Sequence, residues 1–113
     1  MYFAVCGDVE VSPTYYKAMI GQTVVVDCRS TSNETVIWLK PNTAEEIAEL
    51  ITNTVDGKVL IGLEGKYHVE EPAKGHSRLK ILNAQPSDEG MFICKQSNVD
   101  NIIANMTLAG TLR

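Results

Sequence analysis

The run QPSDEGMFIC, from Gln85 to Cys94, places four different residue types at every second position: Asp88, Gly90, Phe92 and Cys94. Side chains two residues apart lie on the same face of a β-strand. The run therefore predicts a strand on which Phe92 and Cys94 point together toward the interior. A strand of this kind needs partner strands, and this strongly limits the folds open to the chain.

Most other segments also alternate with a period of two, and Gly, Pro, Asn and Asp bound them. The alternation places Val24, Val26 and Cys28 on one face, and it does the same for Leu79 and Ile81. We expect strands within these ranges: 22–28, 35–40, 57–63, 66–70, 77–82, 90–96 and 101–108. Many short strands at such spacing are typical of a β-sandwich or a β-barrel.

The segment NTAEEIAEL, residues 42–50, has a mixed pattern. Asn42 or Thr43 would cap a helix, and Ile47 and Leu50 have helical spacing. The segment lies between two strand-like segments, however, and IAELITNT also alternates. We favour an edge strand, with a helix as the alternative.

Cys28 lies in one strand-like segment, the single tryptophan, Trp38, in the next, and Cys94 in a later one. This Cys…Trp…Cys order and spacing resemble the signature of the immunoglobulin sandwich. DEGMFIC resembles the family motif Asp-x-Gly-x-Tyr-x-Cys at the E–F corner, GQTVVVDC resembles strand B, and GKYHV resembles the start of strand D. The resemblance covers about residues 9–109 and implies an all-β, immunoglobulin-like two-sheet sandwich.

The resemblance also implies roles for particular residues. Cys28 and Cys94 would form the inter-sheet disulfide, and the core would include Trp38, Phe92 and Leu79. Asp88 would pair with Lys66 at the start of strand D, more loosely than with the Arg usual there, because Lys lacks a two-pronged donor. Gly90 would fit the tight backbone of the corner. Phe92 departs from the pattern, since the family's Tyr bonds backbone through its hydroxyl.

The long interval between Cys28 and Cys94 leaves room for strands C′ and C″, which resembles the variable type, or V-set, or an extended I-set. NIIANMTLAG has no Phe-Gly-x-Gly motif, so an antigen receptor is not expected. We divide the chain into a leader stub or remnant (1–7), an immunoglobulin-like domain (8–110) and a tail or linker (111–113).

Composition and motifs exclude several classes of function. The 113-residue chain has 10 Lys and Arg against 14 Asp and Glu, a net charge of −4, with no basic cluster. We therefore expect no nucleic-acid partner and no direct membrane contact. We find no nucleophile elbow and no phosphate-binding loop, and we interpret His68 and His76 as surface residues. The sequence predicts no enzyme, no cofactor and no metal.

Cysteines and sequons favour an extracellular protein. Asn33 and Asn105 each begin an Asn-x-Thr sequon, and glycosylation at both is expected beside the disulfide. Cys6 is not needed for this disulfide. We interpret it as part of a cloning or signal-peptide remnant, as a free thiol, or as a cysteine that pairs outside the domain.

The most suggestive feature is the outer face of the predicted G-F-C-C′ sheet. If Trp38 and Phe92 point inward, the side chains that point outward are apolar too: Ile37, Leu39, Met91, Ile93 and Ile103. A solvated sheet face is normally polar, so such a patch indicates a binding surface. The alternatives are that C′, C″ and loops cover the patch, or that the register is shifted by one residue. A glycan on Asn105 would project from the same face, so either the patch is used away from that end or Asn105 is unoccupied.

The sequence therefore predicts a recognition module in the ectodomain of a single-pass adhesion or recognition receptor. In related receptor domains this face is the common docking surface, so the resemblance implies binding of the same or a related immunoglobulin-like domain, with a homodimer as one form. The alternatives are a structural immunoglobulin module of a filament or matrix protein and a secreted ligand-binding decoy.

Overall fold

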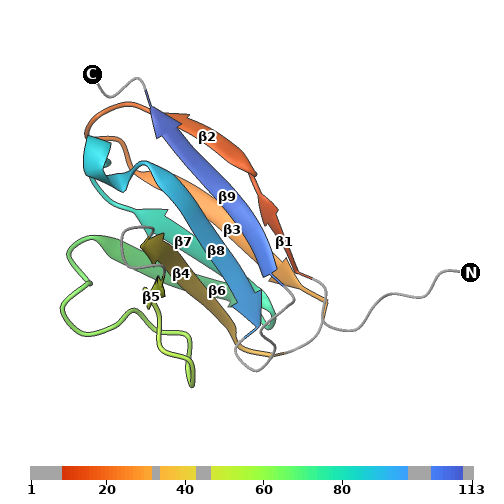
Figure 1. The fold of residues 1–113 in the computed structure, drawn as a ribbon. Helices are drawn as coiled ribbons and strands as arrows, with labels where there is room; N and C mark the ends of the chain where they lie inside the picture. Colours follow the sequence, from red (N-terminus) through yellow and green to blue (C-terminus); the bar gives the residue numbers. More distant parts are fainter. Residues whose placement is uncertain (1–8, 32–33, 43–46, 97–102, 111–113) are drawn as a thin grey trace, which may run out of the picture.

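The computed structural model describes residues 9–31, 34–42, 47–96 and 103–110. These residues form two packed β-sheets (Figure 1). The four-stranded sheet has the order β1 (Val9–Ser12), β3 (Val24–Ser30), β7 (His76–Ile81), β6 (Tyr67–Ala73). The five-stranded sheet has the order β2 (Tyr15–Ala18), β9 (Ile103–Gly110), β8 (Gly90–Gln96), β4 (Val36–Asn42), β5 (Ile47–Leu50). The fold is the predicted all-β sandwich.

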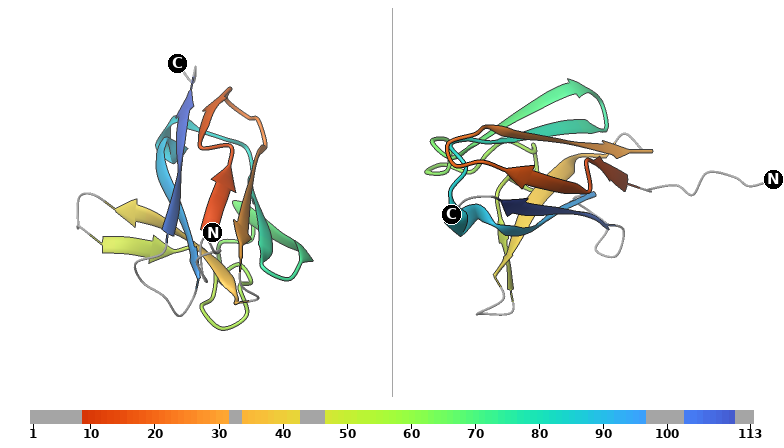
Figure 2. Two further views of the ribbon diagram at one scale, coloured as in Figure 1. Left: turned by 90° about the vertical axis from the view of Figure 1, so that its right-hand side faces the viewer. Right: turned by 90° about the horizontal axis from the view of Figure 1, so that it is seen from above.

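The core fills the space between the two sheets, which the right panel of Figure 2 shows as separate layers. Trp38, Phe92 and Leu79, the predicted core residues, are fully buried. Strand alternation places Met106 and Leu108 of β9 in the same core. The predicted inward direction of Phe92 and Cys94 is confirmed.

The segment with the mixed pattern ends in an edge strand. β5 pairs antiparallel with β4, with Leu50 opposite Leu39, and is the last strand of its sheet. The edge-strand interpretation is therefore confirmed for residues 47–50, while residues 43–46 lie outside the described residues.

The expected C″ strand is not formed in the described residues, and the prediction of a strand over 57–63 is wrong. Between β5 and β6 the pairing consists of one isolated bridge, Thr52 to Val59. The side chains of Asn53 and Asp56 accept hydrogen bonds from the backbone N–H groups two residues further on. Gly57 adopts a positive φ of 72°. These local turns fold the segment back on itself, so its apolar residues cannot extend as a strand.

The sequence analysis did not predict β1 and β2. β1 pairs antiparallel with β3, whereas β2 runs parallel to β9 in the other sheet. Pro13 lies between the two strands, where the chain passes from one sheet to the other. The alternation of Val9 and Val11 followed by Pro13 is the sequence signal for the first of them.

Candidate functional site

A disulfide and a hydrogen bond connect the two sheets at the centre of the sandwich, next to each other. Cys28 and Cys94 form a disulfide across 66 positions of sequence. The Trp38 indole N–H donates a hydrogen bond of 2.8 Å to Ser77 Oγ. Cys28 lies opposite Ser77 in one sheet, and Trp38 lies opposite Cys94 in the other. Each sheet therefore contributes two neighbouring residues, and the two bonds fix the position of one sheet relative to the other.

The turn before β8 shows why the run QPSDEGMFIC contains an aspartate, Asp88. Asp88 ends the short 3₁₀-helix Pro86–Asp88 and is 5% exposed. Its Oδ2 accepts a hydrogen bond of 2.8 Å from the backbone N–H of Gln85 and lies 2.5 Å from Lys66 Nζ. Lys66 thus contacts Asp88 through a single oxygen, and its Nζ also donates a hydrogen bond of 3.1 Å to the carbonyl oxygen of Asn83.

The half-buried Lys40 lies over the aromatic ring of this corner. Lys40 Nζ is 4.2 Å from the centre of the Phe92 ring, and the edge of Tyr67 packs against the same ring. Gly90 has a φ of 130°, which other residues rarely adopt, and this conformation rather than space favours glycine, since a Cβ atom would lie at an ordinary contact distance of 3.6 Å from Lys40 Nζ. Burial lowers the pKa of Lys40, although the carboxylate of Asp88 opposes the shift. Lys40 could not be predicted from the sequence, because no motif marks it.

The outer face of the five-stranded sheet is apolar across its centre. Directly paired positions form one row, Leu50, Leu39, Ile93 and Asn105, across four strands. Met91 is 42% exposed and Ile103 is 44% exposed, whereas Leu39 and Ile93 are half-buried. Tyr15, which the sequence analysis did not include, extends the surface over β2. We call the following residues the apolar face: Tyr15, Leu39, Leu50, Met91, Ile93 and Ile103.

The assignment of Ile37 to this surface is wrong. Ile37 is 1% exposed, although it points away from the core cluster around Trp38. Lys95 lies opposite it on β8, and the chain continues beyond β5 along the other side of β4, where the Ile51 N–H bonds to the Trp38 carbonyl. The segment after β5 also approaches β4 at Gly57, where an added Cβ atom would lie 3.2 Å from the Val36 carbonyl oxygen.

The outer face of the four-stranded sheet has the opposite character. Arg78 bonds to Asp27 at 3.0 Å and contacts Glu70 at 3.4 Å, and Lys80 lies 3.3 Å from Glu70. We call these four residues the charged face. Burial alone would raise the pKa of Asp27, but hydrogen bonds from His76 and Arg78 outweigh it and lower that pKa.

Of the two histidines, only His68 is the expected surface residue. His76 is 8% exposed, and its Nε2 lies 2.8 Å from Asp27 Oδ1, so the interpretation of His76 as a surface residue is wrong. The reason is its place beside Asp27 at the start of β7. Within the described part of the chain no group of three His, Cys, Asp or Glu residues is placed to hold a metal ion.

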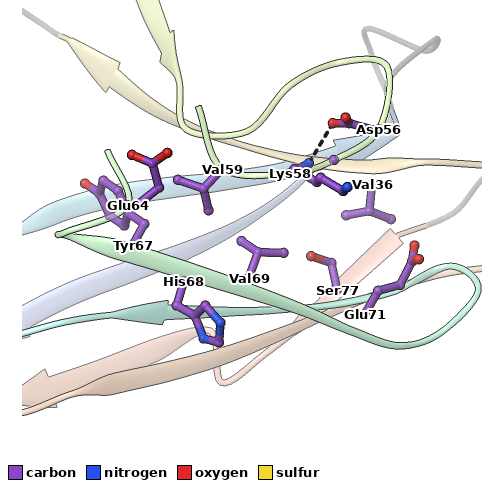
Figure 3. A pocket seen from close by; sticks show the side chains of 11 residues that line it. Val36, Asp56, Lys58, Val59, Glu64, Tyr67, His68, Val69, Glu71 and Ser77 are labelled. Atoms are coloured by element: carbon purple, nitrogen blue, oxygen red, sulfur yellow. Dashed lines mark hydrogen bonds between the residues drawn. The ribbon is translucent and has the colours of Figure 1, made fainter. Parts of the chain in front are cut away.

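A pocket of about 420 Å³ opens between β6 and the segment before it. Figure 3 shows Val59 and Val69 around its centre, with Glu64 toward one end and Glu71 toward the other. Ser77 also lines it, but its Oγ already accepts the Trp38 hydrogen bond. The lining offers apolar contact and negative charge rather than a nucleophile with its base.

A family model for the immunoglobulin V-set domain matches residues 11–109. The chain is an immunoglobulin V-set domain. A search of curated proteins finds no match. V-set domains are generally binding modules without enzymatic activity, and a disulfide-bonded V-set domain is typical of extracellular proteins. No helix among the described residues is long and apolar enough to cross a membrane.

The V-set assignment relates the apolar face to the strands of the family. β4, β5, β8 and β9 correspond to strands C, C′, F and G, so the apolar face is the outer side of the G-F-C-C′ sheet. Asn105 lies exposed on this side. Asn33, Cys6 and the terminal segments 1–7 and 111–113 lie outside the described residues.

Proposed function

We propose that this V-set domain is the recognition module of a cell-surface adhesion or recognition receptor and that it pairs through its apolar face. The observation that carries the proposal is the contrast between the two sheets. One sheet presents an ion-pair network to solvent, whereas the other presents Leu39, Ile93 and Met91. Exposed apolar patches on small domains usually mark protein interfaces.

The chemistry of the apolar face suits a second copy of the same domain. Its six side chains are uncharged, so two copies can meet at these residues about a two-fold axis without opposing like charges, provided that Lys95, which lies opposite Ile103 on the same outer side, stays at the edge of the contact. The face also offers Tyr15 and Met91, two residue types that are enriched at interfaces. We take self-pairing as the form to test first, with a related immunoglobulin-like domain as the alternative partner.

Sedimentation equilibrium of the unglycosylated, disulfide-bonded chain tests the proposal. We expect wild type to form dimers in a concentration-dependent manner and Leu39→Asp and Ile93→Lys to remain monomeric. A desolvated, unpaired charge in an interface costs several kcal/mol, so association should weaken by about 100-fold or more. Thermal midpoints should stay close to wild type, because both side chains lie outside the core cluster.

Val25→Asp is the matched control. Val25 is 38% exposed on the outer side of the other sheet, opposite Lys80, so an acid there should leave association unchanged. A monomeric wild type at all concentrations would exclude self-pairing. Variants that fold and still dimerise would exclude the apolar face.

A further inference from the structure

We propose that N-linked glycosylation of Asn105 masks the apolar face, so that pairing depends on whether this site is occupied. The inference rests on the proposed function, since masking matters only if the face binds. It concerns a modification site whose position on the sheet decides its effect. An oligosaccharide attached elsewhere on the sandwich would leave the face open.

The sequon Asn105-Met106-Thr107 lies entirely within β9. Met106 is fully buried in the core, and by strand alternation Asn105 and Thr107 both point to solvent on the outer side. The attachment direction is therefore fixed by the register of the sheet. A glycan on Asn105 projects outward from the same surface as Ile93.

Asn105 is opposite Ile93 on β8, and Ile93 is opposite Leu39 on β4. Side chains directly opposite each other on neighbouring strands are about 5 Å apart. A partner that packs on Leu39 and Ile93 must therefore come within one strand spacing of the glycosylated nitrogen. A bulky, hydrated oligosaccharide at this position prevents a partner from excluding water from the centre of the face.

The Asn105 side chain has no structural role in the fold that would compete with modification. It makes no hydrogen bond to another described residue and is exposed. Removing the sequon should therefore leave the stability of the domain unchanged. Any change in pairing after the sequon is removed can then be attributed to loss of the glycan.

The modification needs a lipid-linked oligosaccharide diphosphate as donor, which the secretory pathway supplies. The Asn105 amide nitrogen attacks the anomeric carbon, a new C–N bond forms, and the bond from that carbon to the diphosphate oxygen breaks. The lipid diphosphate leaves with the electron pair, and the amide gives up one proton. Thr107, the third residue of the sequon, remains unmodified.

The test compares secreted chains from a eukaryotic host with the unglycosylated chain. Glycopeptide mapping should find Asn105 occupied, and the occupied form should be monomeric. Asn105→Gln and Thr107→Ala should each restore pairing, with association about tenfold stronger or more than in the occupied form. Thr107→Ala keeps Asn105 itself, so agreement between the two variants assigns the effect to the glycan.

Asn33→Gln is the matched control, since it removes the other sequon and should leave pairing blocked. Enzymatic release that converts Asn to Asp is avoided, because it adds a charge to the face. An unoccupied Asn105, or equal pairing of occupied and unoccupied chains, overturns the inference while the proposed function stands. If the unglycosylated chain does not pair at all, self-pairing is excluded and the inference fails with it.

Discussion

Trp38 illustrates how a single buried polar group can set the cost of a mutation. Its indole N–H is fully buried and satisfied by Ser77 Oγ. Ser77→Ala removes the acceptor and leaves a buried donor unpaired, which costs about 1–3 kcal/mol. Chemical denaturation should show this loss, whereas Ser87→Ala, at an exposed serine, should be nearly neutral. Equal midpoints for the two variants would mean that Trp38 finds another acceptor.

Phe92 is the position at which this chain departs from the family motif. Phe92→Tyr should be neutral or stabilising, because the family's Tyr hydroxyl bonds to backbone at this corner. The ring already packs between Lys40 and Tyr67, so the hydroxyl is the single change. The denaturant midpoints of wild type and Phe92→Tyr test this expectation. A loss above about 1 kcal/mol would show that the corner is packed around Phe.

Tyr67 should make the domain sensitive to alkali. Burial raises its pKa from 10.0 to about 12, with nearby Asp88 and Glu49 adding to the shift. The unfolded chain loses the phenol proton first, so the stability is present below pH 10 and falls as the pH rises toward 12, by about 2 kcal/mol. Tyr67→Phe should unfold with less dependence on pH in this window. An identical dependence in both proteins would contradict the assignment.

At the scale of the element, strands with clear alternation could be predicted from sequence and the segment between β5 and β6 could not. β8 has the bounds of GMFICKQ, because each of its buried residues alternates with a less buried one. The apolar residues of GKVLIGL resemble a strand locally, but the turns at Asn53 and Asp56 override that preference. The burial of Ile37 could not be predicted, because alternation assigns a side chain to one side of its strand but does not show what lies over it.

Gly57 tests the role of that segment directly. Its φ is +72°, and a Cβ atom would lie 3.2 Å from the carbonyl oxygen of Val36, at the start of β4. Gly57→Ala should therefore destabilise the domain by about 1 kcal/mol or more. Gly65→Ala, which has no heavy atom within 4 Å of the added Cβ, is the control and should cost little. A harmless Gly57→Ala would mean that the turn does not hold the segment on β4.

At the scale of the whole molecule, the two outer faces of one sandwich differ in chemistry. The charged face is held by ion pairs among Asp27, Arg78, Glu70 and Lys80, which suits contact with solvent. The sequence predicted most of the apolar face from alternation, since Leu39, Met91, Ile93 and Ile103 all lie on it. It missed Leu50 and Tyr15, whose places depend on how β5 and β2 join the sheet.

The most direct test of the central claim is the concentration dependence of methyl chemical shifts in the unglycosylated domain. We predict shifts at Met91, Ile93 and Ile103 as dimers form, with the methyl groups of Val25, on the outer side of the other sheet, unchanged. Shifts at Val25 with none at these three residues, or no concentration dependence at any methyl, would contradict pairing through the apolar face.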